Sequence, residues 1–312
     1  MERSQLIKEG AISLGVYLLF ILITLLVPVL GTFTLLLLPV PFLLFTNRHG
    51  LRPAIFLALF SLAVLFIITG PFALPLILST AAGGIVTGEL LRRKKHAFGA
   101  LLGGSLAFIA AILINYIGSI VLLGINPVGE IQNVLRESVA ASEDMLGFMG
   151  PQNEEAFEAA YQFITHLGYI APVMFVMFGA GYAFVVQWIS SLWMRKKSGY
   201  ITERFPPFRE WSFPKSFIWY YLLTFILIFT DPEEGTALFI ATANLMPLLE
   251  AVMIIQGFAF IFFFFHKKGR SVAFPIIIMI ISFLLPLLLT VVRILGIIDL
   301  GFDLRKRMNS QK

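Results

Sequence analysis

The feature that constrains this chain most is a succession of nine apolar runs. An α-helix of about 20 apolar residues crosses the roughly 30 Å hydrocarbon core of a bilayer. The runs cover residues 11–30, 32–45, 53–68, 74–91, 97–123, 170–193, 217–229, 237–265 and 272–292. Two of them, 32–45 and 217–229, are short for full spans, so a broken or tilted helix is expected in each. The sequence therefore predicts an all-α, polytopic transmembrane helix bundle with eight or nine spans.

The composition of the 312 residues agrees with this class of fold. Hydrophobic residues make up 58% of the chain and charged residues 13%, with a mean hydropathy of +0.90. A soluble domain carries roughly 25% charged residues. The first apolar run has no small-residue cleavage pattern at its end, which indicates a first span rather than a cleaved signal. The absence of cysteine excludes disulfides, thiol metal sites and a cysteine nucleophile.

The charges between the apolar runs are sorted by sign. Basic residues occupy alternate gaps, at Arg48, Arg52, Arg92, Arg93, Lys94, Lys95, Arg195, Lys196, Lys197, Arg204, Arg209, Lys215, Lys267, Lys268 and Arg270. The long segment 126–168 instead holds seven acids against one base, Arg136. Because Lys and Arg concentrate in cytoplasmic loops, the N-terminus and the basic gaps are expected in the cytoplasm. The pI near 9.5 then reflects this sorting, and no nucleic-acid partner is expected.

The C-terminal tail conflicts with a simple count of spans. Nine crossings from a cytoplasmic N-terminus would leave the basic residues 305–307 outside, against the same charge rule. Two alternatives remove the conflict. Either the segment 272–302 folds back as a hairpin, or one of the short runs does not cross.

The acidic segment 126–168 has helical patterning of its own. Apolar residues recur at helical spacing around Val134 and again around Tyr161, with Gly150 and Pro151 between them. One interpretation is a pair of amphipathic helices that form a lid over the outer face. The other is a solvated loop with some helix.

Glu250 is the only charged residue in the run 237–265. An ionised carboxylate near the bilayer midplane costs several kcal/mol, and such residues usually face a bundle interior or a cavity. Arg293 is a candidate partner, because a paired buried carboxylate is far less costly than an isolated one. Counting about 1.5 Å per residue places the two roughly 10 Å apart in depth, so a kink would be needed for contact. Glu250 and Arg293 are therefore candidate ligand-binding residues.

Other polar residues lie inside the apolar runs: Asn115, Tyr116, Gln187, Asn244 and Gln256. Amide side chains in membrane helices commonly hydrogen-bond across helix interfaces, at about 0.6 kcal/mol each. A structural role is the first interpretation for the four amides. The aromatic stretch 205–221 is likewise interpreted as an interfacial belt that anchors the chain.

No catalytic signature is present. The sequence lacks H-E-x-x-H, a Walker A loop, a G-x-S-x-G elbow and a paired-acid helix. The histidines His49, His96, His166 and His266 are scattered over span ends and gaps, which does not favour a metal site. We therefore expect neither an enzyme, nor a metal, nor a cofactor.

Small residues on the first span indicate a close helix contact. Ala11 and Gly15 form a small-xxx-small pattern, which lets another helix approach closely. Glycines at 83, 84, 88, 103 and 104 have the same effect on the fourth and fifth runs. Ala11 and Gly15 are the candidate residues for contact with a partner helix.

Three segments carry a resemblance to a known family. These are residues 203–215 (ERFPPFREWSFPK), residues 256–259 (QGFA) and the tail 295–306 (LGIIDLGFDLRK). They resemble the YybS family of uncharacterised bacterial inner-membrane proteins, over nearly the whole chain. The resemblance implies a multi-pass protein of the bacterial cytoplasmic membrane and implies no established activity.

The first six spans also resemble the S components of energy-coupling-factor transporters. The shared features are Ala11-x-x-x-Gly15, the short second span with Pro39 and Pro41, and the glycines of the fourth span. The resemblance implies a small-molecule site near the outer side, lined by Asn115 and Tyr116. It also implies a transmembrane coupling protein, with its ATPases, docked on the first helix. The chain departs from that family at Gly15, where alanine is usual, and in the spans that follow Trp193.

Two functions follow from these observations. The first is an S-component-like core at residues 1–194, including the acidic segment 126–168, which captures a small molecule for uptake. Residues 195–312 would then be a cytoplasmic loop with two or three further spans. The alternative is a non-transporting scaffold or regulatory protein that acts through its basic, aromatic cytoplasmic loop, residues 195–215.

Overall fold

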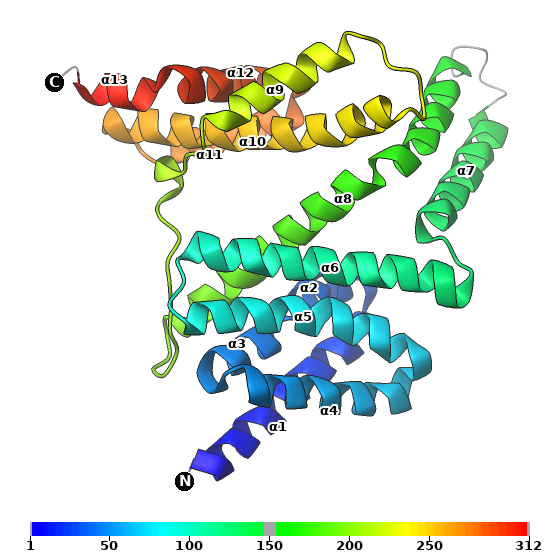
Figure 1. Cartoon of the computed structure of the whole chain (residues 1–312), viewed down its shortest axis with the longest axis vertical. Helices are drawn as coiled ribbons and strands as arrows, with labels where there is room; N and C mark the ends of the chain where they lie inside the picture. The colour runs from blue at the N-terminus through cyan, green and yellow to red at the C-terminus, as the bar shows by residue number, and fades with distance from the viewer. Residues whose placement is uncertain (1, 147–153, 311–312) are drawn as a thin grey trace. The chain divides into compact units, whose positions relative to one another are not determined.

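A computed structural model of the chain describes residues 2–146 and 154–310 (Figure 1). Within them the regular structure is helical, with no strand. The helices are α1 (Glu2–Leu26), α2 (Pro28–Leu37), α3 (Val40–His49), α4 (Leu51–Thr69), η1 (Gly70–Phe72), α5 (Ala73–Arg92), α6 (Ala97–Leu123), α7 (Pro127–Leu146), α8 (Glu154–Met194), η4 (Phe208–Glu210), α9 (Ser216–Ile228), α10 (Ala237–Lys267), α11 (Ala273–Leu284), α12 (Pro286–Phe302) and α13 (Leu304–Ser310). The predicted all-α, polytopic helix bundle is confirmed.

Six helical segments of the described residues are long and apolar enough to cross a membrane. They are Ser4–Leu26, Pro28–His49, Leu51–Arg92, Ala97–Leu123, Glu154–Met194 and Ala237–Lys267. The third of them contains two packed helices, α4 and α5, joined through η1. The second is broken between α2 and α3 at Leu38 and Pro39, as its short apolar run predicts. Helices α9 and α11 are apolar but shorter.

The described residues form two compact units. The first contains residues 2–146 and 174–204, and the second contains residues 154–173 and 205–310. Helix α8 contributes its N-terminal part to the second unit and the rest to the first. The predicted functional division after residue 194 stays a prediction.

Helix α5 is the centre of the first unit, because it packs against α3, α4 and α6. Glycines make this packing close: a Cβ on Gly84 or Gly88 would meet the backbone oxygens of Pro39 and Leu43 on α3. Tyr17 of α1 is fully buried and its hydroxyl lies 3.0 Å from the Thr80 hydroxyl on α5. The predicted role of the α5 glycines in close helix contact is therefore seen directly.

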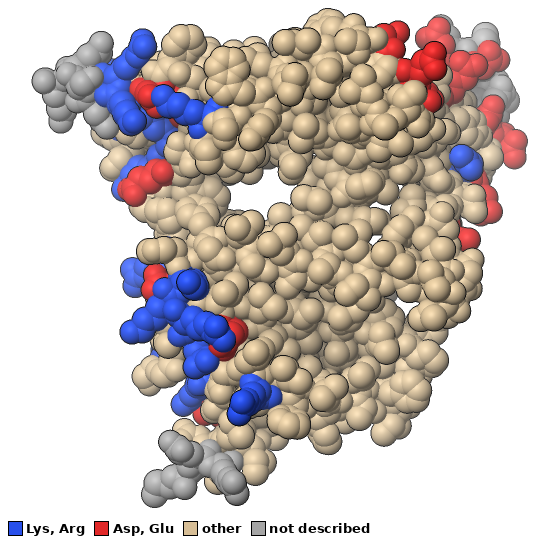
Figure 2. All heavy atoms as spheres, viewed as in Figure 1, with Lys and Arg blue, Asp and Glu red and all other residues tan. Residues whose placement is uncertain are grey.

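Charge is sorted along the helices of the first unit. Helix α6 begins directly after the basic residues 92–95 and ends next to the acidic helix α7, 27 residues later. Most basic residues of this unit gather together, away from the acidic helix α7, which carries Arg136 (Figure 2). We call the side of the unit that holds Arg48, Arg92, Arg93 and the end of α8 its basic end.

In the second unit, α10 and α12 run in the same direction. Along the contact, the residue numbers increase on both helices, from the pair Glu250–Arg293 through Gln256–Asp299 to Lys267–Met308. The helices touch at glycines, since a Cβ on Gly257 would overlap the Val292 carbonyl oxygen and one on Gly296 that of Met253. This close contact fixes the register of the two helices.

The C-terminal segment folds back as a hairpin. Helices α11 and α12 have 12 and 17 residues, so they extend about 18 and 26 Å, and neither spans a 30 Å core alone. The chain reverses at Leu285, between the two helices. Because α12 runs parallel to α10, residues 305–308 return to the end of α10 where Lys267 lies. Of the two alternatives for the tail, the structure has the hairpin, and the basic residues at 267, 268, 270 and 305–307 lie near one end of the second unit.

Helix α8 starts within the acidic segment and continues into the apolar run. The second amphipathic helix expected there is therefore the beginning of α8, while Gly150 and Pro151 lie outside the described residues. Pro172 interrupts the helical hydrogen bonds, and the Asn244 side chain fills the gap. It accepts from the Val173 N–H at 2.9 Å and donates to the Tyr169 carbonyl at 2.7 Å. A side chain inserted in this way is a known cause of kinks in helices.

We predict that Gly296→Ala destabilises the protein. The added methyl group would overlap the backbone of α10, which cannot move aside as a side chain can. Overpacking of this kind costs about 1–3 kcal/mol, so the apparent melting temperature in detergent should fall by several degrees.

The matched control is Gly118→Ala on α6, where no heavy atom lies within 4 Å of the new Cβ. It should leave the melting temperature unchanged or raise it slightly, because alanine favours helix more than glycine does. Equal behaviour of the two variants would contradict the close α10–α12 contact.

Candidate functional site

Asn115, a residue of the predicted outer site, is hydrogen-bonded within the protein. The Asn115 amide donates to the Pro75 carbonyl at 3.0 Å and to the Ser79 hydroxyl at 2.6 Å, which links α6 to α5. Tyr116 donates to the Asn126 side chain at 3.4 Å and packs on Phe175, with ring centroids 5.2 Å apart. None of the four pockets described below, all within residues 2–146 and 154–310, is lined by Asn115 or Tyr116. Their role as ligand-binding residues stays a prediction.

Glu250 and Arg293 form an ion pair between α10 and α12. Their side chains are about one-third and one-quarter exposed. A difference of roughly 10 Å in membrane depth follows if 272–292 is one full span, with Arg293 at its outer end. The hairpin instead places Arg293 inside α12, beside Glu250. The pair satisfies both charges, and its predicted ligand-binding role stays a prediction.

Ala11 and Gly15 lie on an exposed face of α1. No heavy atom lies within 4 Å of a Cβ built on Gly15. Ala11 lines a pocket of about 620 Å³ between α1 and α4. The face is free to accept another helix, as the predicted partner contact requires.

The first half of the 195–215 loop is held by Asn47, a buried residue of α3. The Asn47 amide donates to the Ile201 carbonyl at 2.9 Å and accepts from the Ile201 N–H at 3.0 Å. Both hydrogen-bonding groups of one loop residue are thus bound by one side chain. The guanidinium of Arg48 lies over the Tyr200 ring, 5.7 Å from its centroid, beside this contact.

The second half of the loop is held by three side chains of the second unit. Gln256 and Asp299 are almost fully buried, and the Gln256 amide donates to the Asp299 carboxylate at 2.6 Å. Gln256 also accepts from the Phe213 N–H at 3.1 Å. Arg305 donates to Asp299 at 2.9 Å and to the carbonyls of residues 209 and 211 at 2.9 and 2.8 Å. We call Gln256, Asp299 and Arg305 the loop anchor.

A break between α12 and α13 brings Arg305 into the loop anchor. Asp303 adopts the left-handed conformation, with φ of 50°, which ends α12; Asp is among the few residues that tolerate this region. Burial lowers the pKa of the Arg305 guanidinium, and Asp299 acts in the opposite direction. The guanidinium stays charged, so the buried carboxylate remains paired.

Lys215 and Asp303 form a second, exposed link at the end of the loop. The Lys215 ammonium beside Asp303 holds the pKa of that carboxyl below its usual value. The folded-state pKa is therefore lower than the unfolded one. The contact contributes fully above the unfolded pKa and is lost as the pH falls through the lowered value.

Prolines and aromatic rings explain why residues 205–215 take a fixed shape. Pro206 and Pro207 have restricted backbones and no N–H to satisfy. The Trp211 indole donates to the Pro206 carbonyl at 2.9 Å, which closes a tight turn around η4. Phe208 packs edge-on against Phe262 of α10, with centroids 5.2 Å apart. The loop is therefore a packed element and not a free linker.

The loop anchor forms the floor of a pocket of about 520 Å³ in the second unit. Its lining includes the loop residues Arg209, Glu210 and Lys215, together with Lys306. Cations and carboxylates are nearly balanced in this lining. Among the described residues, no group of three or more His, Cys, Asp or Glu could hold a metal ion.

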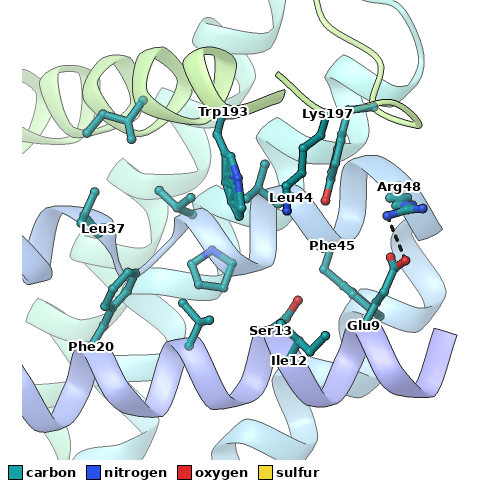
Figure 3. Close-up of a pocket in the computed structure, with 15 residues that line it drawn as sticks. Glu9, Ile12, Ser13, Phe20, Leu37, Leu44, Phe45, Arg48, Trp193 and Lys197 are labelled. Carbon is teal, nitrogen blue, oxygen red and sulfur yellow. Dashed lines mark ion pairs between the residues drawn. The ribbon is translucent and has the colours of Figure 1, made fainter. Parts of the chain in front are cut away.

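A larger feature of the first unit is a groove of about 560 Å³ between α1, α3 and the end of α8 (Figure 3). We call it the α1–α3 groove. Phe20 and Leu37 lie at one end of it, and Glu9 and Arg48 form an ion pair of 2.9 Å at the other. Trp193 and Lys197 cover the groove from the end of α8. A fourth pocket, of about 340 Å³, is an apolar space between α10, α11 and α12.

Sequence reasoning missed the loop anchor. Gln256 is 43 residues from Asp299 in the chain, and Asp299 was not singled out although it is an acid at the end of an apolar stretch. A signal was present nevertheless, because the segments 203–215, 256–259 and 295–306 that carry the family resemblance are those that meet in the anchor. Gly257 and Gly296 were also overlooked as a small-residue contact.

The family described as "Predicted membrane protein (DUF2232)" matches residues 15–300. The chain is 32% identical over 310 residues to "Uncharacterized protein YybS" of Bacillus subtilis (strain 168), which covers 99% of this chain and 100% of that protein. No solved structure matches the chain. The expected likeness to YybS is confirmed, and the likeness to S components stays a prediction.

We predict that Arg305→Gln loosens the second half of the loop. The change removes the charged donor to the carbonyls of residues 209 and 211, and it leaves the buried Asp299 carboxylate with its Gln256 hydrogen bond but without its cationic partner. A hydrogen bond from a charged group contributes about 1.5–3 kcal/mol. Amide hydrogen exchange at Glu210, Trp211 and Phe213 should therefore become at least about tenfold faster.

Lys306→Gln is the control, because Lys306 is exposed and its neighbour Arg305 keeps every contact. Exchange in residues 210–213 should match that of the unchanged protein. Unaltered exchange in Arg305→Gln would show that the anchor does not hold the loop.

We predict energetic coupling between Glu250 and Arg293. Each single change, Glu250→Gln or Arg293→Gln, leaves one charge without its partner in an apolar setting and should destabilise the protein. The double variant should lose less stability than the sum of the single losses, by about 1 kcal/mol. Thermal unfolding of the four proteins in detergent measures this difference, and strict additivity would mean that the contact does not contribute.

Proposed function

The chain belongs to the DUF2232 family of predicted membrane proteins, and on that premise we propose that it is a non-transporting membrane protein that binds a partner protein through its 195–215 loop. The observation that carries the proposal is the support given to this loop. Asn47 binds its first half, and Gln256 and Arg305 bind its second half. Buried polar side chains are costly to keep, so each half of the loop, held by such a side chain within its own unit, is expected to have a required shape.

The chemistry of the loop favours an acidic partner surface. Residues 195–215 contain six bases and two acids. Arg195, Lys196 and Arg204 are exposed. Exposed charges of one sign speed the encounter with a surface of opposite charge, and they disfavour partners of the same charge.

The proposal places the loop and the N-terminus in the cytoplasm of a bacterial cell, with the protein in the cell membrane. Apart from Arg136 on α7 and Arg293 within α12, the described basic residues of each unit lie near one end of the long helices, and acidic residues precede or follow the other end. The positive-inside rule then assigns both basic ends to the cytoplasm. The hairpin of α11 and α12 lets the tail obey the same rule.

The proposed protein is not an enzyme. Glu250, its most isolated carboxylate in the sequence, is paired with Arg293. Asp299 is enclosed by Gln256 and Arg305. Both carboxylates are thus engaged by cationic or amide side chains, which does not favour a role as a general base.

Small-molecule uptake is the second candidate, and the exposed face at Ala11 and Gly15 favours it. An S-component-like subunit would dock a transmembrane coupling protein there, and that protein would bring the ATPases. The hydrogen bonds that Asn115 makes to α5 count against the expected outer ligand site. We therefore rank uptake below partner binding by the loop.

One purification distinguishes the two functions. The full-length protein is cross-linked in cells of its host, solubilised in mild detergent and isolated with bound proteins. We predict that Arg195→Glu, Lys196→Glu and Arg204→Glu, combined, remove a partner that Ala11→Leu with Gly15→Leu retains. The loop anchor and Asn47 are untouched in the first variant, so the loop keeps its shape.

The opposite result has an equally clear meaning. A membrane coupling protein with ATPases, retained by the loop variant and lost with Ala11→Leu and Gly15→Leu, would overturn the proposal and establish uptake.

A further inference from the structure

The α1–α3 groove has the dimensions of one leaflet of a bilayer. Its α1 side is lined by Glu9, Ser13, Val16 and Phe20, which share one face of the helix. From Glu9 to Phe20 the helix rises about 17 Å at 1.5 Å per residue. The hydrocarbon core of a bilayer is about 30 Å thick, so one leaflet accounts for about half of that.

The polarity of the groove changes along this length. Its charged residues, Glu9, Arg48 and Lys197, lie at the basic end of the unit. Apart from Ser13 and Tyr200 the remaining lining is apolar. Leu44 lies in the middle of the groove, and Phe20 and Leu37 lie at the end away from the charges (Figure 3). Such a gradient fits a molecule with a charged head and a hydrocarbon chain. A purely polar metabolite would leave most of the groove unmatched.

Of the two cations that line the groove at its basic end, one is paired with a carboxylate and the other is available to a ligand. Arg48 is neutralised by Glu9 at 2.9 Å, and Glu9 also lies 2.7 Å from His49. Lys197 lies over the Trp193 ring, 4.5 Å from its centroid, and has no carboxylate partner among the described residues. Its side chain reaches down into the groove in Figure 3. The groove therefore offers a single free positive charge to its occupant.

We propose that the α1–α3 groove binds an anionic phospholipid of the leaflet on the basic side. Its phosphate lies against Lys197, and one acyl chain lies along Ser13 and Val16 toward Phe20. The volume of about 560 Å³ falls within the range of roughly 300–1,000 Å³ that is usual for ligand pockets. A tryptophan and a lysine at the head group level are typical of membrane interfaces. This inference does not rest on the proposed protein partner.

Native mass spectrometry of the full-length protein in detergent tests the inference. The probes are phosphatidylglycerol, which is anionic, phosphatidylethanolamine, which has no net charge, and oleate, an anionic single chain. We predict that phosphatidylglycerol is retained at least about fivefold more than phosphatidylethanolamine, since one lysine near the surface contributes about that factor. Lys197→Gln should remove this preference.

Two controls locate the site. Lys196→Gln removes the same charge from the next residue, which does not line the groove, and should keep the preference. Ser13→Phe fills the groove and should lower retention of both phospholipids severalfold, whereas Leu19→Phe, on an exposed face outside the groove, should not. These substitutions are at partly or fully exposed positions, so folding should be kept and can be checked by the melting temperature.

Three results would overturn the inference. Equal retention of the two phospholipids would mean ordinary boundary lipid, and loss of preference in Lys196→Gln as well as Lys197→Gln would mean a diffuse surface charge. Tighter retention of oleate than of phosphatidylglycerol, lost in Ser13→Phe, would assign the groove to a free fatty acid.

Discussion

A backbone group removed from water must find a partner, and this protein meets that requirement with carboxamide side chains. Asn244 bridges the two groups that Pro172 separates in α8. Asn47 binds both groups of Ile201, and Gln256 accepts from Phe213. Asn115 does the same for a carbonyl on α5. The irregular parts of the chain are therefore held by the regular ones, and the shape of the 195–215 loop depends on this.

The α10–α12 contact provides partners for charged side chains as well. Gly257 and Gly296 let the two backbones touch, and the close approach brings side chains from both helices within reach of one another. Above and below the contact lie Glu250 with Arg293 and Gln256 with Asp299. A Cβ at either glycine would overlap the facing backbone and push the helices apart, which would lengthen both contacts. The close contact at small residues thus lets polar side chains between α10 and α12 find partners.

The sequence predicted the class of fold better than the site, for a physical reason. Apolar run length and charge sorting are local properties, so the helices and a break in the short run 32–45 could be anticipated, and the fold-back of the tail was one of two alternatives that the charges allowed. Contacts such as Arg305 with the carbonyl of Trp211 depend on the direction of α12, which the residues 272–302 do not reveal by themselves. The same uncertainty placed Arg293 too far from Glu250. The stretch 205–215, expected to anchor the chain at the interface, is itself anchored by the helices.

Helix α3 connects the two features to which a function has been assigned. Asn47 and Arg48 are consecutive, and they serve different tasks: the first binds Ile201 of the loop, and the second lines the α1–α3 groove. Lys197 and Tyr200 belong to the loop and line the groove as well. An occupant of the groove would therefore lie against the side chains that shape the first half of the loop. Binding at either feature must then affect the other to the extent that it shifts these shared residues, and by linkage the effect is reciprocal.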